Sequence, residues 1–416
     1  MIQGILIAIL LGAQDPAPVP VQECRPRAGL PNFLAKVQTA GAEVKVAYFG
    51  GSITAQPGWR PKTLAHFQKT WPDARFSEIN AAIGGTGSDL GVFRLAHDVL
   101  EKKPDLLFVE FAVNDGGAPP DQIRRCMEGI VRQTWRTLPD CDVCFVYTVT
   151  DTLAPSLLEG KFPRAAATME EIADRYGIPS IHLAVEVARL AKEGNLLWKA
   201  PLSKNAGDVV AFAADGVHPY PETGHELYLQ AVVRSLPPIQ QASKSRGAHA
   251  LPEPLIASNY ERARLLPISE AVLSKGFAFL DPEKDAFGKR WANRLPALHR
   301  AGESGELLSF KFKGTRCAIY DIIGPDCGQV RVTLDDQPPR TVLRFDSFCT
   351  YHRLATLLVG TELPDAVHSV KIEIHPDSPD KAKILAQRKE SMDKPERYRG
   401  TAFYPGAILL VGELVK

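Results

Sequence analysis

Val44-Lys45-Val46-Ala47-Tyr48-Phe49-Gly50-Gly51-Ser52-Ile53-Thr54 gives the clearest indication of how this chain folds. The run from Val44 to Phe49 consists mostly of residues that favour β-strands, and it stops at two glycines. Glycine adopts backbone angles that are closed to other residues, so the chain can reverse sharply here. The following residues have a helical pattern. We therefore predict a strand, a tight turn and a helix, with the hydroxyl of Ser52 at the turn. A turn that merely caps the helix is the alternative.

Strand-like and helix-like segments alternate after this turn. The further predicted strands cover residues 75–83, 105–112, 142–149 and 178–183. The predicted helices cover residues 59–71, 89–102 and 121–138, with two more around residues 169–176 and 229–236, whereas residues 197–214 are expected to form a loop. Strands and helices that alternate at this spacing predict an α/β fold, with a parallel sheet covered by helices on both faces.

A polar stretch at residues 237–250 predicts a linker, and the pattern changes beyond it. Short strand-like runs separated by turn residues predict a second domain that is all β, a sandwich or jelly roll. Within it, the charged segment Ser378–Arg399 is expected to be a solvated insertion. We expect a signal peptide and Pro-rich spacer at residues 1–20, an α/β domain at 21–240 and a β-sandwich domain at 241–416.

Length and charge narrow the classes of protein. A chain of 416 residues is too long for one ordinary core, and its 49 basic and 48 acidic residues give no general attraction to nucleic acid or to anionic membranes. Met1–Ala13 is apolar, too short to span a bilayer, and ends in small residues, which predicts a signal peptide and a secreted or periplasmic protein with no membrane insertion after cleavage. The segment lacks Lys and Arg, so a buried first strand is the alternative. Cys24 lacks the small neighbours of a lipid-attachment site.

The seven cysteines give little indication of metal or redox chemistry. Cys141 and Cys144 form a lone CxxC without a second pair or a His at ligand spacing, so we predict buried thiols and no metal. An odd number leaves at least one cysteine free or paired between chains. One disulfide could form among Cys317, Cys327 and Cys349, and the sequence does not choose between them.

Chemically useful residues follow the ends of the predicted strands. Ser52, Gly85 and Asn114 each stand just past a strand, where parallel sheets gather functional groups, and Asp215 and His218 precede the last helix. Acyl transfer to water needs a nucleophile, a base, a group that orients the base and donors for an oxyanion. Ser52 would attack, His218 would act as base and then acid, and Asp215 would orient it. The N–H groups of Ser52 and Gly85 and the amide of Asn114 would form the oxyanion hole.

Four blocks in this order resemble those of the SGNH hydrolases, the GDSL-type esterase and lipase superfamily, over roughly Val44–Leu236. The blocks are Gly50–Thr54, Asn80–Gly85, Val109–Asp115 and Asp215–Pro219. The resemblance implies a three-layer α/β/α fold like that of flavodoxin, a serine esterase, and no metal or organic cofactor.

Three positions depart from the family pattern. Gly51 replaces the usual aspartate, Ile53 a leucine and Val113 a glycine. None of these changes removes a catalytic group, so they bear on the shape of the acyl pocket rather than on the reaction.

Other classes fit the residues less well. An α/β-hydrolase needs Gly-x-Ser-x-Gly, and Thr54 stands where the second glycine would be. Gly85-Thr86-Gly87 is not followed by the spacing of a dinucleotide-binding turn. A lipid or thioester acylhydrolase and a glycan-binding protein with an inert hydrolase domain remain as alternatives.

The expected substrate is an acylated carbohydrate, with O-acetyl groups as the ester. It rests on the export signal, on the absence of a long apolar segment that would form a lipid-binding lid, and on a loose resemblance of residues 305–334 to jelly-roll modules beside carbohydrate-active esterases. Trp59 and Trp198, placed in loops, would stack on a sugar, and Asp151 would face the cleft. Packing against the core and capping are the alternatives for these side chains. The sequence does not predict the oligomeric state.

Overall fold

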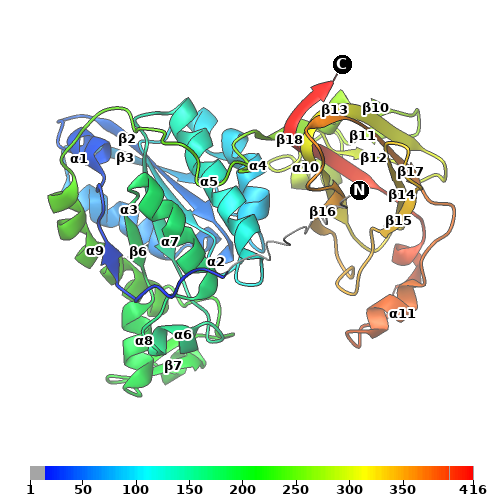
Figure 1. Cartoon of the computed structure of the whole chain (residues 1–416). Coiled ribbons are helices and arrows are strands. Elements are labelled where there is room, and N and C mark those ends of the chain that lie inside the picture. Colours follow the sequence, from blue (N-terminus) through cyan, green and yellow to red (C-terminus); the bar gives the residue numbers. More distant parts are fainter. Residues whose placement is uncertain (1–14, 393, 416) are drawn as a thin grey trace, which may run out of the picture. The chain divides into compact units, whose positions relative to one another are not determined.

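A computed structural model describes residues 15–392 and 394–415 of the chain (Figure 1). These residues form two compact units, the first ending at Glu261 and the second beginning at Arg262. The predicted signal peptide, Met1–Ala13, lies outside the described residues. None of the helices in the described ranges combines the length and the apolar character that crossing a bilayer requires.

The first unit is built on a six-stranded sheet. Its strands lie in the order β1 (Cys24–Arg25), β6 (Ser180–His182), β5 (Asp142–Tyr147), β4 (Leu106–Glu110), β2 (Glu43–Gly50) and β3 (Arg75–Asn80). The pairs from β6 to β3 are parallel, and β1 pairs antiparallel with β6. The predicted parallel sheet is therefore confirmed for these five strands, and the antiparallel strand β1 at its edge was not predicted.

Helices cover both faces of this sheet. One group packs together with every second residue of β2, including Val44, Val46 and Tyr48, and consists of α1 (Pro31–Val37), α3 (Trp59–Thr70), α8 (Val185–Lys192) and α9 (Gly224–Ala242). The other group consists of α4 (Ser88–Asp98), α5 (Pro120–Thr137) and α7 (Arg164–Tyr176). The α/β architecture with covering helices agrees with the sequence prediction. Short helices follow two of the strands: α2 (Ser52–Ala55) and α6 (Ala154–Leu158).

The predicted loop at residues 197–214 is wrong. Two short parallel strands, β7 (Leu196–Lys199) and β8 (Val210–Ala213), pair there, with the 3-10 turn η2 (Leu202–Lys204) between them. A further turn of this kind, η1 (Leu100–Lys102), follows α4.

The predicted linker is also wrong, because its first part is helical. Helix α9 continues through Pro237 and Pro238 to Ala242, where the buried side chain of Ile239 joins the core. The following segment, residues 243–261, bonds to the first unit: Nε2 of His249 lies 2.8 Å from Oδ1 of Asp142. The boundary expected at residue 240 thus falls inside a helix, and polar composition gave no sign of these contacts.

The second unit is an antiparallel β-structure. Its main strands lie in the order β15 (Arg340–Leu343), β14 (Gln329–Leu334), β17 (Ala366–Ile374), β13 (Leu307–Ile323), β18 (Tyr404–Val415) and β9 (Ala263–Pro267), and β10 (Val272–Leu273) and β16 (Arg353–Gly360) also pair with β13. A separate pair joins β11 (Ala278–Phe279) to β12 (His299–Arg300). The remaining elements are short: η3 (Ile268–Glu270), α10 (Ala286–Trp291), α11 (Lys381–Ala386) and η4 (Pro395–Tyr398). The predicted all-β second domain is confirmed.

The long strand β13 connects two halves of this sheet. Its first part pairs with β17 and its last part with β16, while β18 runs along the other edge. Gly314 and Gly412 face each other where the register shifts, and a Cβ on either would overlap a carbonyl oxygen of the opposite strand. Glycine is required at this crossing because the two backbones approach so closely.

Most described side chains of the charged segment Ser378–Arg399 are exposed, as expected, but Lys381, Leu385 and Tyr398 within it are buried. Leu385 and Tyr398 are buried in a small cluster of apolar side chains. Lys381 is buried too, and its ammonium donates to the carbonyl oxygens of Pro325, Tyr398 and Gly400 at 3.0, 2.8 and 3.0 Å. All seven cysteines belong to the described part of the chain and are free thiols, and Cys141 and Cys144 are buried as predicted.

Candidate active site

Ser52 stands at the carboxyl edge of the parallel sheet. Strand β2 ends at Gly50, Gly51 precedes the helix in an extended conformation, and Ser52 is the first residue of α2. No side chain caps this helix. The hydroxyl is therefore presented beside backbone N–H groups of a first helical turn, which carry partial positive charge.

His218 joins Ser52 to Asp215. Its Nε2 lies 2.8 Å from the hydroxyl oxygen of Ser52, and its Nδ1 lies 2.7 Å from Oδ2 of Asp215. The other carboxylate oxygen of Asp215 accepts the backbone N–H groups of Val217 and His218, at 2.9 and 2.8 Å. The structure thus brings together three side chains that the sequence analysis had selected.

The charge on Asp215 is well stabilised. Partial burial acts to raise its pKa, but the hydrogen bonds from the imidazole of His218 and from the N–H groups of His218 and Val217 lower this pKa to about 2. The carboxylate stays ionised across the neutral range, so it can hold the proton of Nδ1 and stabilise an imidazolium.

Asn114 and the loop at Gly84 and Gly85 lie against the serine. A Cβ on Gly51 would overlap Oδ1 of Asn114, so the hydrogen of Gly51 makes room for this amide. A Cβ on Gly84 would stand 3.5 Å from the Cβ of Ser52. Gly85 has a φ of +73°, in the left-handed region that favours glycine. The segments predicted to supply oxyanion donors therefore converge on Ser52.

Trp59 is not a ligand-binding residue, which corrects the sequence prediction. Its side chain is 0% exposed and packs against Tyr48 and Phe108, with ring centroids 5.2 and 5.7 Å apart. Its indole N–H donates to the hydroxyl of Thr54 at 3.3 Å. Helix α3 begins at Trp59, so the side chain belongs to the core rather than to a loop.

The other two predicted substrate residues have different surroundings. The carboxylate of Asp151 lies against the Cα of Gly216, and its N–H donates to the carbonyl of Gly216 at 3.0 Å, so it is beside the loop of Asp215 and His218. Trp198 is half-buried on β7 and contacts Phe212 edge to face, with centroids 5.2 Å apart. Contact of either residue with a substrate remains a prediction.

Two buried carboxyl groups behind the serine were missed. Glu110 ends strand β4 and is 1% exposed, and Asp115 follows Asn114 and is 3% exposed. Burial raises the pKa of each to about 7, against the lowering effect of their hydrogen bonds. A glutamate inside the apolar run of residues 105–112 was the signal available in the sequence.

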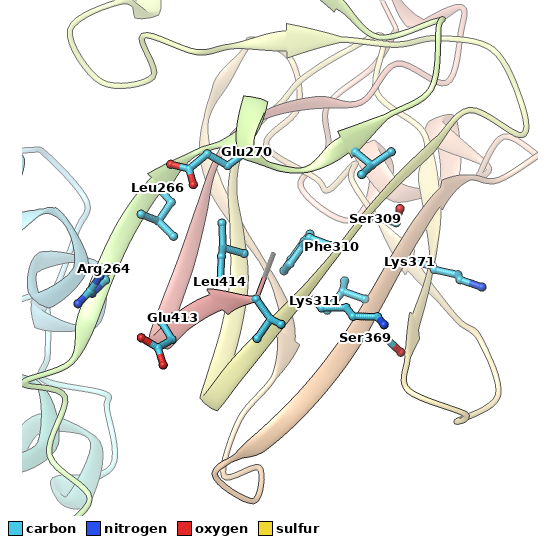
Figure 2. Close-up of a pocket in the computed structure, with 13 residues that line it drawn as sticks. Arg264, Leu266, Glu270, Ser309, Phe310, Lys311, Ser369, Lys371, Glu413 and Leu414 are labelled. Atoms are coloured by element: carbon cyan, nitrogen blue, oxygen red, sulfur yellow. The ribbon is translucent and has the colours of Figure 1, made fainter.

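A pocket in the second unit has none of this chemistry. It holds about 820 Å³ and is lined by apolar side chains such as Leu266, Phe310 and Leu414, with Arg264 and Lys311 among its charged residues (Figure 2). None of the predicted site residues lines it. Among residues 15–392 and 394–415, no group of three or more His, Cys, Asp or Glu side chains is placed to hold a metal ion.

Comparison with known proteins places this geometry in a family. Residues 48–227 match the model of the GDSL-like Lipase/Acylhydrolase family. Comparison with curated proteins gave no match.

Two crystal structures are similar to the whole chain. One is of a two-domain esterase (CEX) active on acetylated mannans, co-crystallized with mannopentaose, with 19% identity, a TM-score of 0.70, and coverage of 94% of this chain and 97% of that chain. The other, of a two-domain esterase (CEX) active on acetylated mannans, has 18% identity, a TM-score of 0.70, and coverage of 94% and 98%. At such identity the likeness concerns the fold. The α/β unit of this chain belongs to the GDSL-like lipase/acylhydrolase (SGNH) family, a family of esterases.

Proposed function

We propose that the protein is a serine esterase that removes short acyl groups, O-acetyl in particular, from a polysaccharide or oligosaccharide. The observation that carries the proposal is the continuous chain of hydrogen bonds from Ser52 through His218 to Asp215. Such a chain joins a nucleophile, a base and the group that orients the base.

The reaction follows from this arrangement. The hydroxyl of Ser52 attacks the ester carbonyl carbon while Nε2 of His218 accepts its proton, and Asp215 stabilises the imidazolium. The oxyanion accepts hydrogen bonds from the N–H groups of Ser52 and Gly85 and from the amide of Asn114. His218 then gives the proton to the departing sugar oxygen, which leaves an acyl ester on Ser52. Water, deprotonated by His218, attacks this ester. The acyl–oxygen bond then breaks, His218 returns the proton to the oxygen of Ser52, and the carboxylic acid is released.

Exposure at the site supports a large leaving group. Asn114 and Asp215 are exposed and Ser52 and His218 are partly exposed, so an acyl group on a polymer can reach the serine without the polymer being enclosed. The fold shared with a two-domain esterase active on acetylated mannans supports a glycan as the carrier of the ester.

The family also includes lipases, so the acyl chain must be tested. Rates on p-nitrophenyl esters from acetate to long-chain acids distinguish a deacetylase from a lipid or thioester acylhydrolase. We expect kcat/KM to be highest for acetate. A clear preference for long chains would overturn the deacetylase proposal.

The direct experiment measures acetate released from acetylated mannan, xylan and other acetylated glycans. We expect release by the wild-type protein and none above background by Ser52→Ala. Ser378→Ala, which changes an exposed serine of the second unit, is the matched control and should keep wild-type rates on p-nitrophenyl acetate. Binding of these glycans without any Ser52-dependent release would instead favour an inert hydrolase domain.

Export is part of the same proposal, because an esterase acting on a polysaccharide must reach it. The apolar segment Met1–Ala13 supports secretion to the periplasm or the medium. Mass spectrometry of the N-terminus of the exported protein tests this, and a chain that keeps Met1 inside the cell would contradict it.

A further inference from the structure

The short segment from Glu110 to Asp115 connects two buried carboxyl groups with an exposed amide. Glu110 ends β4, Asp115 lies five residues further on, and Asn114 stands between them with its side chain against Gly51. Both carboxyl groups point into the protein, and both bond to segments that the proposed mechanism uses.

Glu110 bonds to the turn that carries the nucleophile. Its Oε2 accepts the hydroxyl of Thr54 at 2.8 Å, and the carboxylate also accepts the backbone N–H of Gly51, the residue before Ser52. Its Oε1 accepts the hydroxyl of Thr148, at the end of the neighbouring strand β5, at 2.8 Å. One side chain therefore fixes both ends of the short helix that begins at Ser52.

Asp115 bonds to the loop that carries Gly85. Its Oδ1 accepts the backbone N–H of Ser88 at 3.0 Å, and the hydroxyl of Ser88 also bonds to this carboxylate. A Cβ on Gly87 would overlap the same oxygen, so the loop fits closely around it. Ser88 begins the helix α4, and a carboxylate at this end is favoured by the helix dipole.

Oδ2 of Asp115 has a different environment. It is buried and, within the described part of the chain, has no hydrogen-bond partner. Burial of half a carboxylate without a partner is unfavourable, so the side chain is retained at a cost in stability. A buried polar atom without a partner is rare in native structures and needs an explanation.

We propose that Glu110 and Asp115 are positioning residues that align the oxyanion hole, by holding the turn of Ser52 and the loop of Gly85 to the one segment that carries Asn114. The inference rests on the proposed function and deepens it. The segment from Glu110 to Asp115 then fixes the distances between the three expected donors, which are the N–H groups of Ser52 and Gly85 and the amide of Asn114. Oxyanion donors act only where charge develops, so a small displacement lowers kcat more than it changes KM.

The test uses kinetics of the full chain on p-nitrophenyl acetate. Asp115→Ala removes the acceptor for Ser88, and we expect kcat to fall roughly 100-fold with KM within about twofold. Asp115→Asn keeps an oxygen for the N–H of Ser88 and should recover most of this rate. Glu110→Gln places an amide where donors point, and kcat should fall by about tenfold.

A double variant separates positioning from general destabilisation. If Asp115 acts through the oxyanion donors, Asp115→Ala should cost much less in an Asn114→Ala background than in the wild type, because the effects of residues acting as a unit are not additive. Asp285→Ala and Glu128→Gln are the matched controls. Asp285 caps a helix of the second unit, and Glu128 is a buried glutamate bonded to two backbone N–H groups and to Tyr176.

The outcomes are distinct. Loss of kcat confined to Glu110 and Asp115, with Asp115→Asn active and the double variant non-additive, supports the inference. Unchanged kcat in Asp115→Ala and Glu110→Gln, or fully additive losses, would overturn it while the esterase proposal stands. Hydrolysis that survives Ser52→Ala would overturn the proposed function and the inference together.

Discussion

The two units contain similar Asp–His pairs that have different second partners. In the first unit Nδ1 of His218 meets Asp215 at 2.7 Å and Nε2 faces the hydroxyl of Ser52. In the second unit Nδ1 of His368 meets Asp335 at 2.8 Å, but Nε2 faces the carbonyl oxygen of Pro364 at 2.9 Å. A carbonyl can only accept, so His368 makes both hydrogen bonds only when both of its ring nitrogens carry protons. A hydroxyl can also donate, so Nε2 of His218 is free to take a proton.

The comparison shows that an Asp–His pair is not itself a sign of catalysis. Burial acts to lower the pKa of His368, but its hydrogen bonds to Asp335 and to Pro364 raise it. These hydrogen bonds favour the protonated form of that histidine. The partner on the far nitrogen distinguishes the base from the structural residue.

The largest expected effect comes from removing either member of the Ser52–His218 contact. Ser52→Ala or His218→Ala should lower kcat on p-nitrophenyl acetate by roughly 10⁴-fold or more, since the proton transfer is lost. His368→Ala should leave kcat within about twofold and affect only stability. A comparable loss of kcat in His368→Ala would break the comparison.

The orienting carboxylates should differ in the same way. Asp215→Asn should lower kcat by about 10³- to 10⁴-fold, because an amide favours the wrong tautomer of His218. Asp335→Asn should keep full activity at a temperature where the protein is folded. Steady-state kinetics and circular dichroism of both variants check this pair, and equal kcat values for the two would contradict it.

A smaller loss is expected from the oxyanion side. Asn114→Ala should lower kcat roughly 100-fold, about 3 kcal/mol of transition-state stabilisation, with little change in KM. Asn80→Ala is a control, since Asn80 bonds to the N–H of Ala82 in the same edge of the sheet. A rise in KM at constant kcat would show that Asn114 binds substrate rather than the transition state.

The smallest effect concerns stability and pH in the second unit. A histidine with a raised pKa in the folded state stabilises fully below its unfolded pKa, near 6.5, and this contribution is lost as pH rises through the folded pKa. We expect the melting temperature of this unit to fall by about 2 °C over that window, and His368→Gln to remove the dependence. Calorimetry across pH measures it, and an unchanged pH dependence in His368→Gln would contradict the assignment.

The sequence could predict the catalytic and oxyanion residues because they are either close together in the chain or follow a topological rule. Asp215 and His218 are three residues apart, and Ser52, Gly85 and Asn114 follow ends of parallel strands, which meet at one edge. The rule does not predict which buried side chains support the residues at that edge. Glu110 was hidden in a strand that reads as apolar, and Asp115 resembled an ordinary turn residue.

Trp59 and Lys381 are buried for reasons that composition does not report. The predicted helix at residues 59–71 begins where α3 begins, but the pattern did not show that the indole of Trp59 turns into the core instead of toward a ligand. The segment Ser378–Arg399 is mostly exposed, as its charges predict, yet Lys381 within it is buried and donates to three carbonyl oxygens. Composition reports what a side chain prefers on average, and a specific partner can reverse that preference.

The polar segment 243–261 decides where the chain can be shortened. The carboxylate of Glu128 accepts hydrogen bonds from the backbone N–H groups of Leu255 and Ile256, and that of Asp142 bonds to the imidazole of His249. Both carboxylates therefore have hydrogen-bond partners beyond α9. A truncated protein ending at Ala242 would leave Glu128 with only the hydroxyl of Tyr176 and Asp142 without His249, in the interior of the fold. One ending at Glu261 would keep these partners, and it is the shortened form in which the α/β unit can be tested for folding alone.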